Sequence, residues 1–316
     1  MRPGHEAAWE EWNAALSGPR MHHGWILAGR QGLWKREFAL EAAHKLVGGG
    51  PEATGHPDII VLNRPPKDDK EERKRADGKP FQRKRNITVD QIRQMQRRLT
   101  TRPTLGERRA VIVDPADDLE KSASNALLKS LEEPPKGTYF LLVTHRPARL
   151  LPTIRSRCRI IRFAPLSDAA IEDLLAEQSA GIDRSAMKAA IAAAGGSPGA
   201  ALAFLEQDLA SVAVLMRDII GTGDPDFSLR GKLSAAIGAR PDRERLQATF
   251  EIARSIMAEQ MASTPETGLA ALADAHADLV ALGGQAPTYN YDPGFLAMEI
   301  GSLLASAAPH RERANV

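Results

Sequence analysis

Five short, almost continuously apolar segments alternate with helix-like segments between Gly24 and Phe163, and this alternation constrains the fold more than any other feature of the sequence. In chain order the segments are GWILAG, PDIIVL, RRAVIVD, TYFLLVTH and RCRIIRF. Strands that are apolar at consecutive positions suit a parallel sheet covered on both faces, because neither face of such a strand meets water. We therefore predict an α/β domain in which helices lie between the strands of a parallel sheet.

Three helices are expected between these strands. They span Lys35–Val47, Thr88–Leu99 and Ser122–Glu133. The second opens with Thr88 followed three residues later by Gln91, a capping box in which both side chains satisfy free backbone amides. The third ends at Pro134 and Pro135, because proline rings cannot continue a helix.

The pattern changes after Phe163, where alanine- and leucine-rich helical periodicity replaces the strands. We expect a boundary near Ala164 and an all-helical remainder. Gly195-Gly196 predicts the end of one helix, and Ser197-Pro198 predicts the start of the next, with serine as N-cap and proline at the first helical position. Glycine and proline mark two further loops, at Gly221 to Pro225 and around Gly283 to Pro293.

Composition excludes several classes of protein. The 316 residues are enough for two or three cores, and a formal net charge of +2 is too small to make the whole chain a polyanion binder. The single cysteine, Cys158, excludes an internal disulfide and a cysteine-based zinc cluster. No window approaches the roughly 18 apolar residues of a membrane span, and the N-terminus lacks the pattern of a secretory signal. We expect a soluble, cytoplasmic protein that contacts no membrane.

Residues 64–85, RPPKDDKEERKRADGKPFQRKR, differ from the rest of the chain in composition. They contain ten Lys or Arg against five Asp or Glu, a net charge of +5, and almost no apolar side chains. Such a segment buries too little surface to offset its ordering entropy, which favours a mobile, solvated insertion. The alternative is a contact for DNA phosphates or for an acidic partner.

Residues 29–36, GRQGLWKR, resemble a phosphate-binding loop of the form G-x-x-x-x-G-K-[ST]. An apolar strand precedes them, a helix follows them, and Gly29, Gly32 and Lys35 lie within them. Trp34 replaces the glycine that lets the backbone approach phosphates, and Arg36 replaces the hydroxyl that meets magnesium. Weak or absent nucleotide binding is therefore expected, although turns between strand and helix also carry glycines and lysines without any relation to nucleotides.

The strand expected at residues 110–114 ends in Asp114, a position at which active relatives of such folds help to hold magnesium. Pro115 follows, where active enzymes place a glutamate that polarises the attacking water. Proline has no group for that task. The sequence thus lacks the carboxylate needed for hydrolysis.

Three further segments identify a family resemblance: ALLKSLEEPP from Ala126, FLLVT from Phe140 and TIRSRC from Thr153. In this order they strongly resemble bacterial clamp loaders, members of the AAA+ superfamily that form part of a DNA polymerase III holoenzyme. The resemblance covers about residues 20 to 205, and the rest matches only in being helical. It implies an AAA+ RecA-like domain over residues 1–165, a helical lid over 166–207 and a helical collar, for oligomerisation, over 208–316.

Within this family the chain is more similar to the delta-prime type than to the ATP-using gamma/tau type. Gamma/tau subunits have an intact phosphate loop, an aspartate-glutamate pair and zinc-binding cysteines, which this sequence lacks. Delta-prime subunits keep the fold with a degraded nucleotide site and retain the Ser-Arg-Cys triplet, here Ser156-Arg157-Cys158. The lid of ATP-using relatives also carries an arginine after a Gly-Ser turn, and here that place holds Gly199 and no arginine.

The resemblance implies a role for Arg157, which in this family projects toward the γ-phosphate held by the next subunit and acts in trans. Ser156 and Cys158 are expected to position and pack that arginine. The implied partners are gamma/tau-like ATPase subunits, a delta-like subunit, the sliding clamp and, through the complex, primer-template DNA. Many delta-prime subunits carry a zinc module where this chain has its insertion, so we expect no zinc, no other metal and no cofactor here.

Alternatives remain open at this point. The chain could be an active ATPase with divergent motifs, or a DNA-binding module acting through residues 64–85. The arginines at 155, 157, 159 and 162 could form an exposed basic edge, either solvated or bound to DNA. His22-His23 lacks a third ligand at metal-site spacing and is taken as an ordinary surface pair.

Overall fold

The computed structural model describes all residues except 1–3, 49–54, 179–183, 290 and 309–316. It divides into two compact units, Met1–Pro165 and Leu166–Val316, and each is described by itself. The boundary expected near Ala164 lies beside this division. Within residues 166–316 the helices α8 (Arg184–Ala194) and α9 (Pro198–Glu206) pack against α12 (Arg243–Ser263), so a further division at residue 207 stays a prediction.

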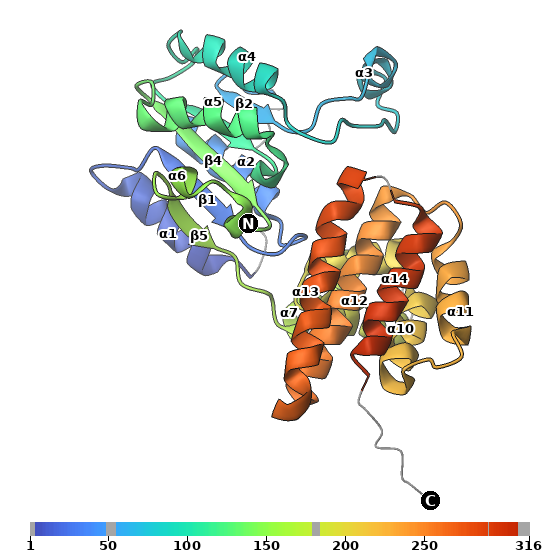
Figure 1. The fold of residues 1–316 in the computed structure, drawn as a ribbon. Helices are drawn as coiled ribbons and strands as arrows, with labels where there is room; N and C mark the ends of the chain where they lie inside the picture. Colours follow the sequence, from blue (N-terminus) through green and yellow to red (C-terminus); the bar gives the residue numbers. More distant parts are fainter. Residues whose placement is uncertain (1–3, 49–54, 179–183, 290, 309–316) are drawn as a thin grey trace, which may run out of the picture. The chain divides into compact units, whose positions relative to one another are not determined.

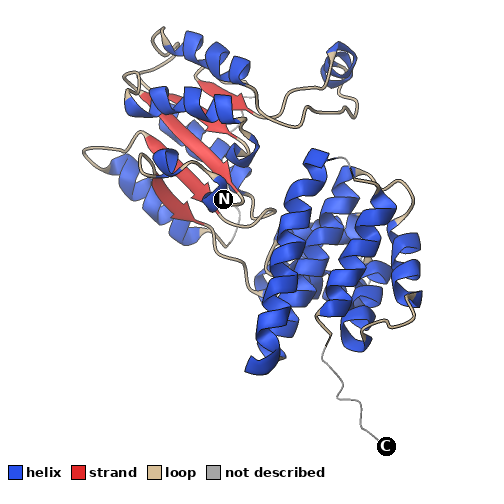
Figure 2. Cartoon of the chain, in the orientation of Figure 1, coloured by secondary structure: helices blue, strands red, loops and turns tan. Residues whose placement is uncertain are grey.

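A five-stranded parallel sheet of order β2-β3-β4-β1-β5 forms the centre of the first unit (Figure 2). The strands are β1 Gly24–Ala28, β2 Ile59–Leu62, β3 Arg109–Val113, β4 Thr138–Thr144 and β5 Arg159–Arg162. Every residue of β1 and β3 is buried, as continuous apolar strands require. The predicted α/β class with a parallel sheet and an all-helical remainder is confirmed.

Helices cover both faces of this sheet (Figure 1). They are α1 Glu6–Ser17, α2 Lys35–Val47, α4 Val89–Leu99, α5 Lys121–Glu132 and α6 Pro152–Arg155, with single 3₁₀ turns at Ala116–Asp118 and Pro147–Arg149. Helix α3 Asp69–Ala76 lies on the insertion, away from the sheet. On one face α4 and α5 pack against alternate strand residues such as Ile26, Val111 and Phe140. On the other, Trp12 of α1 meets Trp25 of β1 edge to face, with ring centroids 5.4 Å apart. Helix α2 begins and ends where predicted, and the Thr88/Gln91 capping box of α4 is present.

The insertion at residues 64–85 is more ordered than its composition predicted. It contains α3, whose N-cap Asp68 accepts a hydrogen bond from the Glu71 amide at 3.0 Å. An antiparallel bridge between Pro66 and Arg83 closes its base. Local capping and ion pairs stabilise this helix without an apolar face, which the composition did not reveal. The predicted mobility of the segment stays a prediction.

The second unit is helical throughout its described residues. Its helices are α7 Asp168–Gln178, α8 Arg184–Ala194, α9 Pro198–Glu206, α10 Ala210–Thr222, α11 Ser228–Ile237, α12 Arg243–Ser263, α13 Glu266–Tyr289 and α14 Pro293–Ser306. The predicted cap at Ser197 is confirmed, since its hydroxyl accepts from the Ala200 amide at 3.2 Å. Among the described residues no single helix is long and apolar enough to cross a membrane, and α9 with α10 meets that test only when joined across a 109° bend.

The loop expected from Gly283 to Pro293 is mostly helix, because α13 continues to Tyr289. A Cβ atom at Gly283 would lie 3.3 Å from the Phe250 ring of α12. Glycine here serves close packing of two helices rather than a turn. The loop predicted at Gly221 to Pro225 begins two residues later, because α10 continues to Thr222 and Gly223 is its left-handed C-cap.

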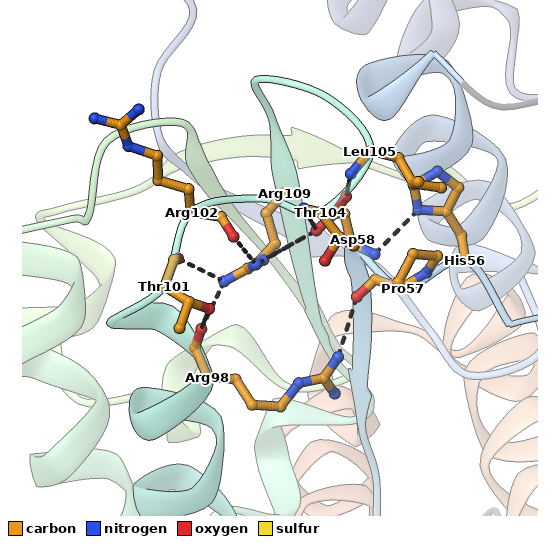
Figure 3. Close-up of polar contacts among 9 residues, drawn as sticks. All are labelled: His56, Pro57, Asp58, Arg98, Thr101, Arg102, Thr104, Leu105 and Arg109. Carbon is orange, nitrogen blue, oxygen red and sulfur yellow. Dashed lines mark hydrogen bonds and ion pairs between the residues drawn. The ribbon is translucent and has the colours of Figure 1, made fainter.

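A buried ion pair fixes the amino-terminal ends of β2 and β3 (Figure 3). Asp58 is fully buried, and its carboxylate accepts from the amides of Thr104 and Leu105 at 2.7 and 2.8 Å and from Arg109 at 3.4 Å. The Arg109 guanidinium also donates to the carbonyls of Arg98, Thr101 and Arg102. Burial alone raises the pKa of Asp58, but these donors outweigh it and hold the pKa below its ordinary value.

Removing this carboxylate destabilises the first unit. Asp58→Ala leaves the Arg109 charge buried without its partner, and we expect a loss of about 3–5 kcal/mol in the free energy of unfolding. Denaturant titration measures it. The matched control is Asp90→Ala, which breaks the exposed Asp90–Arg93 pair and costs less than about 1 kcal/mol. Equal losses in both variants would contradict a structural role for the buried pair.

Candidate functional site

The degenerate phosphate loop connects the carboxyl end of β1 to α2. Gly32 has a φ of 77° and Trp34 a φ of 52°, both in the left-handed region that favours glycine. Trp34 thus adopts a backbone conformation that suits glycine better, and its indole is largely buried in the protein. A Cβ at Gly29 would lie 2.6 Å from the Phe163 carbonyl oxygen, so this glycine is required by packing alone.

Lys35 turns back into the loop that carries it. The side chain is buried, and its ammonium donates to the carbonyl of Arg30 at 2.5 Å. Burial lowers the pKa of Lys35 to about 8, against the opposing attraction of Asp117 and Asp114. The lysine that reaches phosphates in an intact loop is here bonded to protein.

Two half-buried carboxylates at the carboxyl end of β3 are each paired with an arginine. Arg36 lies 3.6 Å from Asp114, and Arg64 lies 3.1 Å from Asp118. Burial raises the pKa of both carboxyls, that of Asp118 to about 6, and the arginines oppose this shift. A guanidinium group therefore lies beside each carboxylate, including Asp114, which the sequence analysis related to the magnesium position of active enzymes.

Asp117, which the sequence analysis missed, ties the ends of two strands together. Its carboxylate accepts from the Thr144 hydroxyl at 2.8 Å and from the amides of His145 and Arg146 at 2.6 and 3.1 Å. Burial lowers the pKa of the adjacent His145 to about 4, so this imidazole is neutral at physiological pH. The signal was present as three aspartates within five residues, Asp114 to Asp118.

Arg157 lies at the opposite end of the sheet from the phosphate loop. Its carbonyl lies beside Gly24, the first residue of β1, whereas the loop begins at Gly29, after the last. At about 3.3 Å per residue these positions are separated by roughly 15 Å along the strand. Arg157 and the chain's own loop therefore belong to different edges of the domain.

The Arg157 side chain is 36% exposed and is held by three oxygen atoms. It forms an ion pair with Glu132 at 2.8 Å and donates to the Thr153 carbonyl at 2.9 Å and the Ser156 hydroxyl at 3.2 Å. Glu132 was not singled out from the sequence, although it ends α5 directly before the Glu-Pro-Pro stop. This arrangement presents a charged, directed guanidinium at the surface of the first unit.

Cys158 and the histidine pair have structural surroundings. Burial raises the pKa of the Cys158 thiol to about 12, so it stays protonated, and it packs against Gly24. His23 contacts the Leu131 carbonyl at 2.8 Å, and His22 stacks on it at 4.6 Å. In the described part of the chain no three His, Cys, Asp or Glu residues gather as a metal site. Arg155, Arg159 and Arg162 are exposed, so an exposed basic edge formed by these arginines and Arg157 stays an open alternative.

The sheet order, the loop between β1 and α2 and the following helical unit define an AAA+-type domain. In overall fold the chain is similar to the crystal structure of a DNA polymerase III gamma subunit-related protein from Thermotoga maritima, with a TM-score of 0.50 and 17% identity over 94% of this chain and 98% of that one. At this identity the likeness concerns the fold alone.

The sequence then gives the family: residues 4–167 match the family described as DNA polymerase III, delta subunit, and the chain belongs to it. It is 34% identical over 213 residues to the DNA polymerase III subunit delta' of Pseudomonas aeruginosa, covering 62% of this chain and 58% of that protein. The match to the subunit delta' of Escherichia coli is 40% identical over 129 residues, 41% of this chain and 38% of that protein. The matched region thus spans less than two thirds of the length of these relatives. The chain is delta-prime-like, as the sequence predicted.

The buried Lys35 makes stability depend on pH in the alkaline range. The folded-state pKa of Lys35 is about 8, below the 10.5 of an exposed lysine, so the unfolded chain binds more protons than the folded chain between pH 8 and pH 10.5. The wild type therefore gains stability relative to Lys35→Met as pH rises, by about 2 kcal/mol between pH 7.5 and 9.5. Urea unfolding of both proteins across this range measures the difference. A stability difference that stays constant with pH would contradict a lowered pKa of Lys35 in the folded state.

Proposed function

We propose that the chain is a non-hydrolysing, delta-prime-type subunit of a DNA polymerase III clamp loader in the cytoplasm. It holds the ring of gamma/tau-like ATPase subunits and a delta-like subunit, and it supplies Arg157 in trans during loading of the sliding clamp on primer-template DNA. The observation that carries this proposal is the position of Arg157: partly exposed, charged and at the far edge of the sheet from the chain's own loop.

The loss of hydrolysis is supported by four local features. Lys35 is bonded to its own loop, Arg36 and Arg64 accompany the carboxylates Asp114 and Asp118, and Pro115 offers no base. Hydrolysis of a nucleotide requires a phosphate cradle, a metal and a group that orients water. In this chain a bound phosphate or metal would have to displace an existing hydrogen bond or ion pair. The position of the group that orients water holds a proline.

The chemistry proposed for Arg157 follows from its guanidinium. The group remains charged at all physiological pH values and presents a planar fork of donors that matches phosphate oxygens. Negative charge that develops on a transferred γ-phosphoryl group is stabilised by such a donor when it is already oriented. The contacts to Thr153 and Ser156 provide that orientation, whereas the Glu132 contact must be exchanged for the phosphate.

Arg157→Ala in a complex reconstituted with ATPase partners and clamp tests the proposal. Arginines that act in trans contribute on the order of 10³–10⁵ in rate in GTPase systems, and we expect DNA-stimulated ATP hydrolysis and clamp loading to fall at least tenfold here. Arg155→Ala is the matched control, because it removes the same charge two residues away from an exposed position. Gel filtration establishes that both complexes assemble.

Hydrolysis and loading that remain unchanged in Arg157→Ala would contradict the trans role. An equal loss in Arg155→Ala would instead assign the effect to the basic edge as a whole. Arg157→Lys separates charge from geometry, and we expect it to restore only part of the rate, because an ammonium lacks the planar fork.

A further inference from the structure

Residues 64–85 form a loop that carries helix α3, and we call this segment the basic arm. Figure 1 shows α3 at the tip of a loop that projects from the sheet. Backbone hydrogen bonds join its two limbs, from the Lys67 amide to the Gln82 carbonyl at 2.9 Å and from the Lys84 amide to the Pro65 carbonyl at 2.6 Å. The arm is therefore closed at its base and presents its side chains on a defined backbone.

Most acidic side chains of the arm form hydrogen bonds or ion pairs with other residues of the arm. Glu71 is buried and accepts from the Gln82 amide at 2.6 Å and from Lys74 at 2.7 Å. Asp68 caps α3, while Glu72 pairs with Arg75 at 2.5 Å and Asp77 pairs with Lys79 at 3.1 Å. Four of the five acids thus serve the fold of the arm.

Several cations of the arm are left over after this pairing. Lys70 and Arg73 lie one turn apart on α3, and Lys84 lies on the returning limb. All three are exposed, and within the described residues none of them has an acidic partner. These three side chains therefore present positive charge to solvent.

We propose that the basic arm binds the phosphate backbone of duplex DNA without regard to base sequence. Spaced lysines and arginines on an exposed element supply the sequence-independent part of DNA affinity, because each neutralised phosphate releases counterions. Contacts of this kind position a protein on DNA and need no groove for bases.

The composition of the arm favours duplex DNA over two other polyanions. A protein partner, even an acidic one, is normally held by apolar or aromatic anchors, and Phe81, the only aromatic residue of the arm, is covered by the Arg83 guanidinium at 4.6 Å. Single-stranded DNA is normally held by several aromatic rings on which successive bases stack, and the arm has one aromatic residue. Binding to the phosphates of a DNA duplex requires only exposed cations, and the arm presents these.

Binding of a short fluorescent duplex to the whole chain, without ATPase partners, tests the inference by anisotropy across a series of salt concentrations. The triple variant Lys70→Ala/Arg73→Ala/Lys84→Ala is expected to lose at least tenfold in affinity at low salt. The slope of log K against log salt becomes shallower by about 2 to 3, as the loss of three phosphate contacts requires. Since no ATP is hydrolysed, the result is independent of the role of Arg157.

A charge-matched control carries Lys45→Ala/Arg93→Ala/Arg217→Ala, three cations that each pair with an acid outside the arm. We expect it to bind the duplex as the wild type does. An unchanged affinity in the arm variant, or an equal loss in the control, would overturn the inference. Displacement by polyglutamate at a lower charge concentration than by unlabelled duplex would overturn it as well, because the arm would then prefer an acidic polypeptide.

Discussion

Carboxylates buried at the carboxyl end of a parallel sheet need positive charge beside them, and this chain supplies it from its own side chains. Asp114 and Asp118 follow β3 at the edge that also carries the degenerate phosphate loop, and Arg36 and Arg64 lie next to them. Arg36 comes from the start of α2 and Arg64 from the base of the insertion. The loop, the helix behind it and the insertion are thereby joined through one set of charges.

Parallel strands separate the two ends of the domain, and this separation gives the chain its proposed division of roles. The carboxyl ends carry the closed loop, in which Lys35 is bonded to protein. The amino ends carry Arg157, held by Glu132 and Thr153 and partly exposed. The two ends of the sheet therefore carry the two parts of the proposal, the loop at one edge and the partly exposed Arg157 guanidinium at the other.

The sequence predicted the sheet and α2 closely because each strand is apolar at consecutive positions and each helix has recognisable caps. It missed α1, whose Trp9 and Trp12 were examined only for a secretory signal. It also predicted a loop at Gly283, because glycine at a helix contact and glycine at a turn look identical without the facing Phe250 ring. In the candidate site, the departures at Trp34 and Arg36 from the phosphate-loop pattern could be recognised from residue spacing alone. The partners of charged groups, such as Glu132 for Arg157, depend on packing between elements and were not.

The central claim is that the chain's own nucleotide site is closed by its own residues. Titration of Mg-ATP into the whole chain, followed by calorimetry, tests it most directly. The account predicts no saturable binding at nucleotide concentrations up to about 1 mM, which corresponds to a binding free energy weaker than about −4 kcal/mol. Saturable binding in the micromolar range would contradict it, because Lys35, Arg36 and Arg64 would then have left the contacts described here.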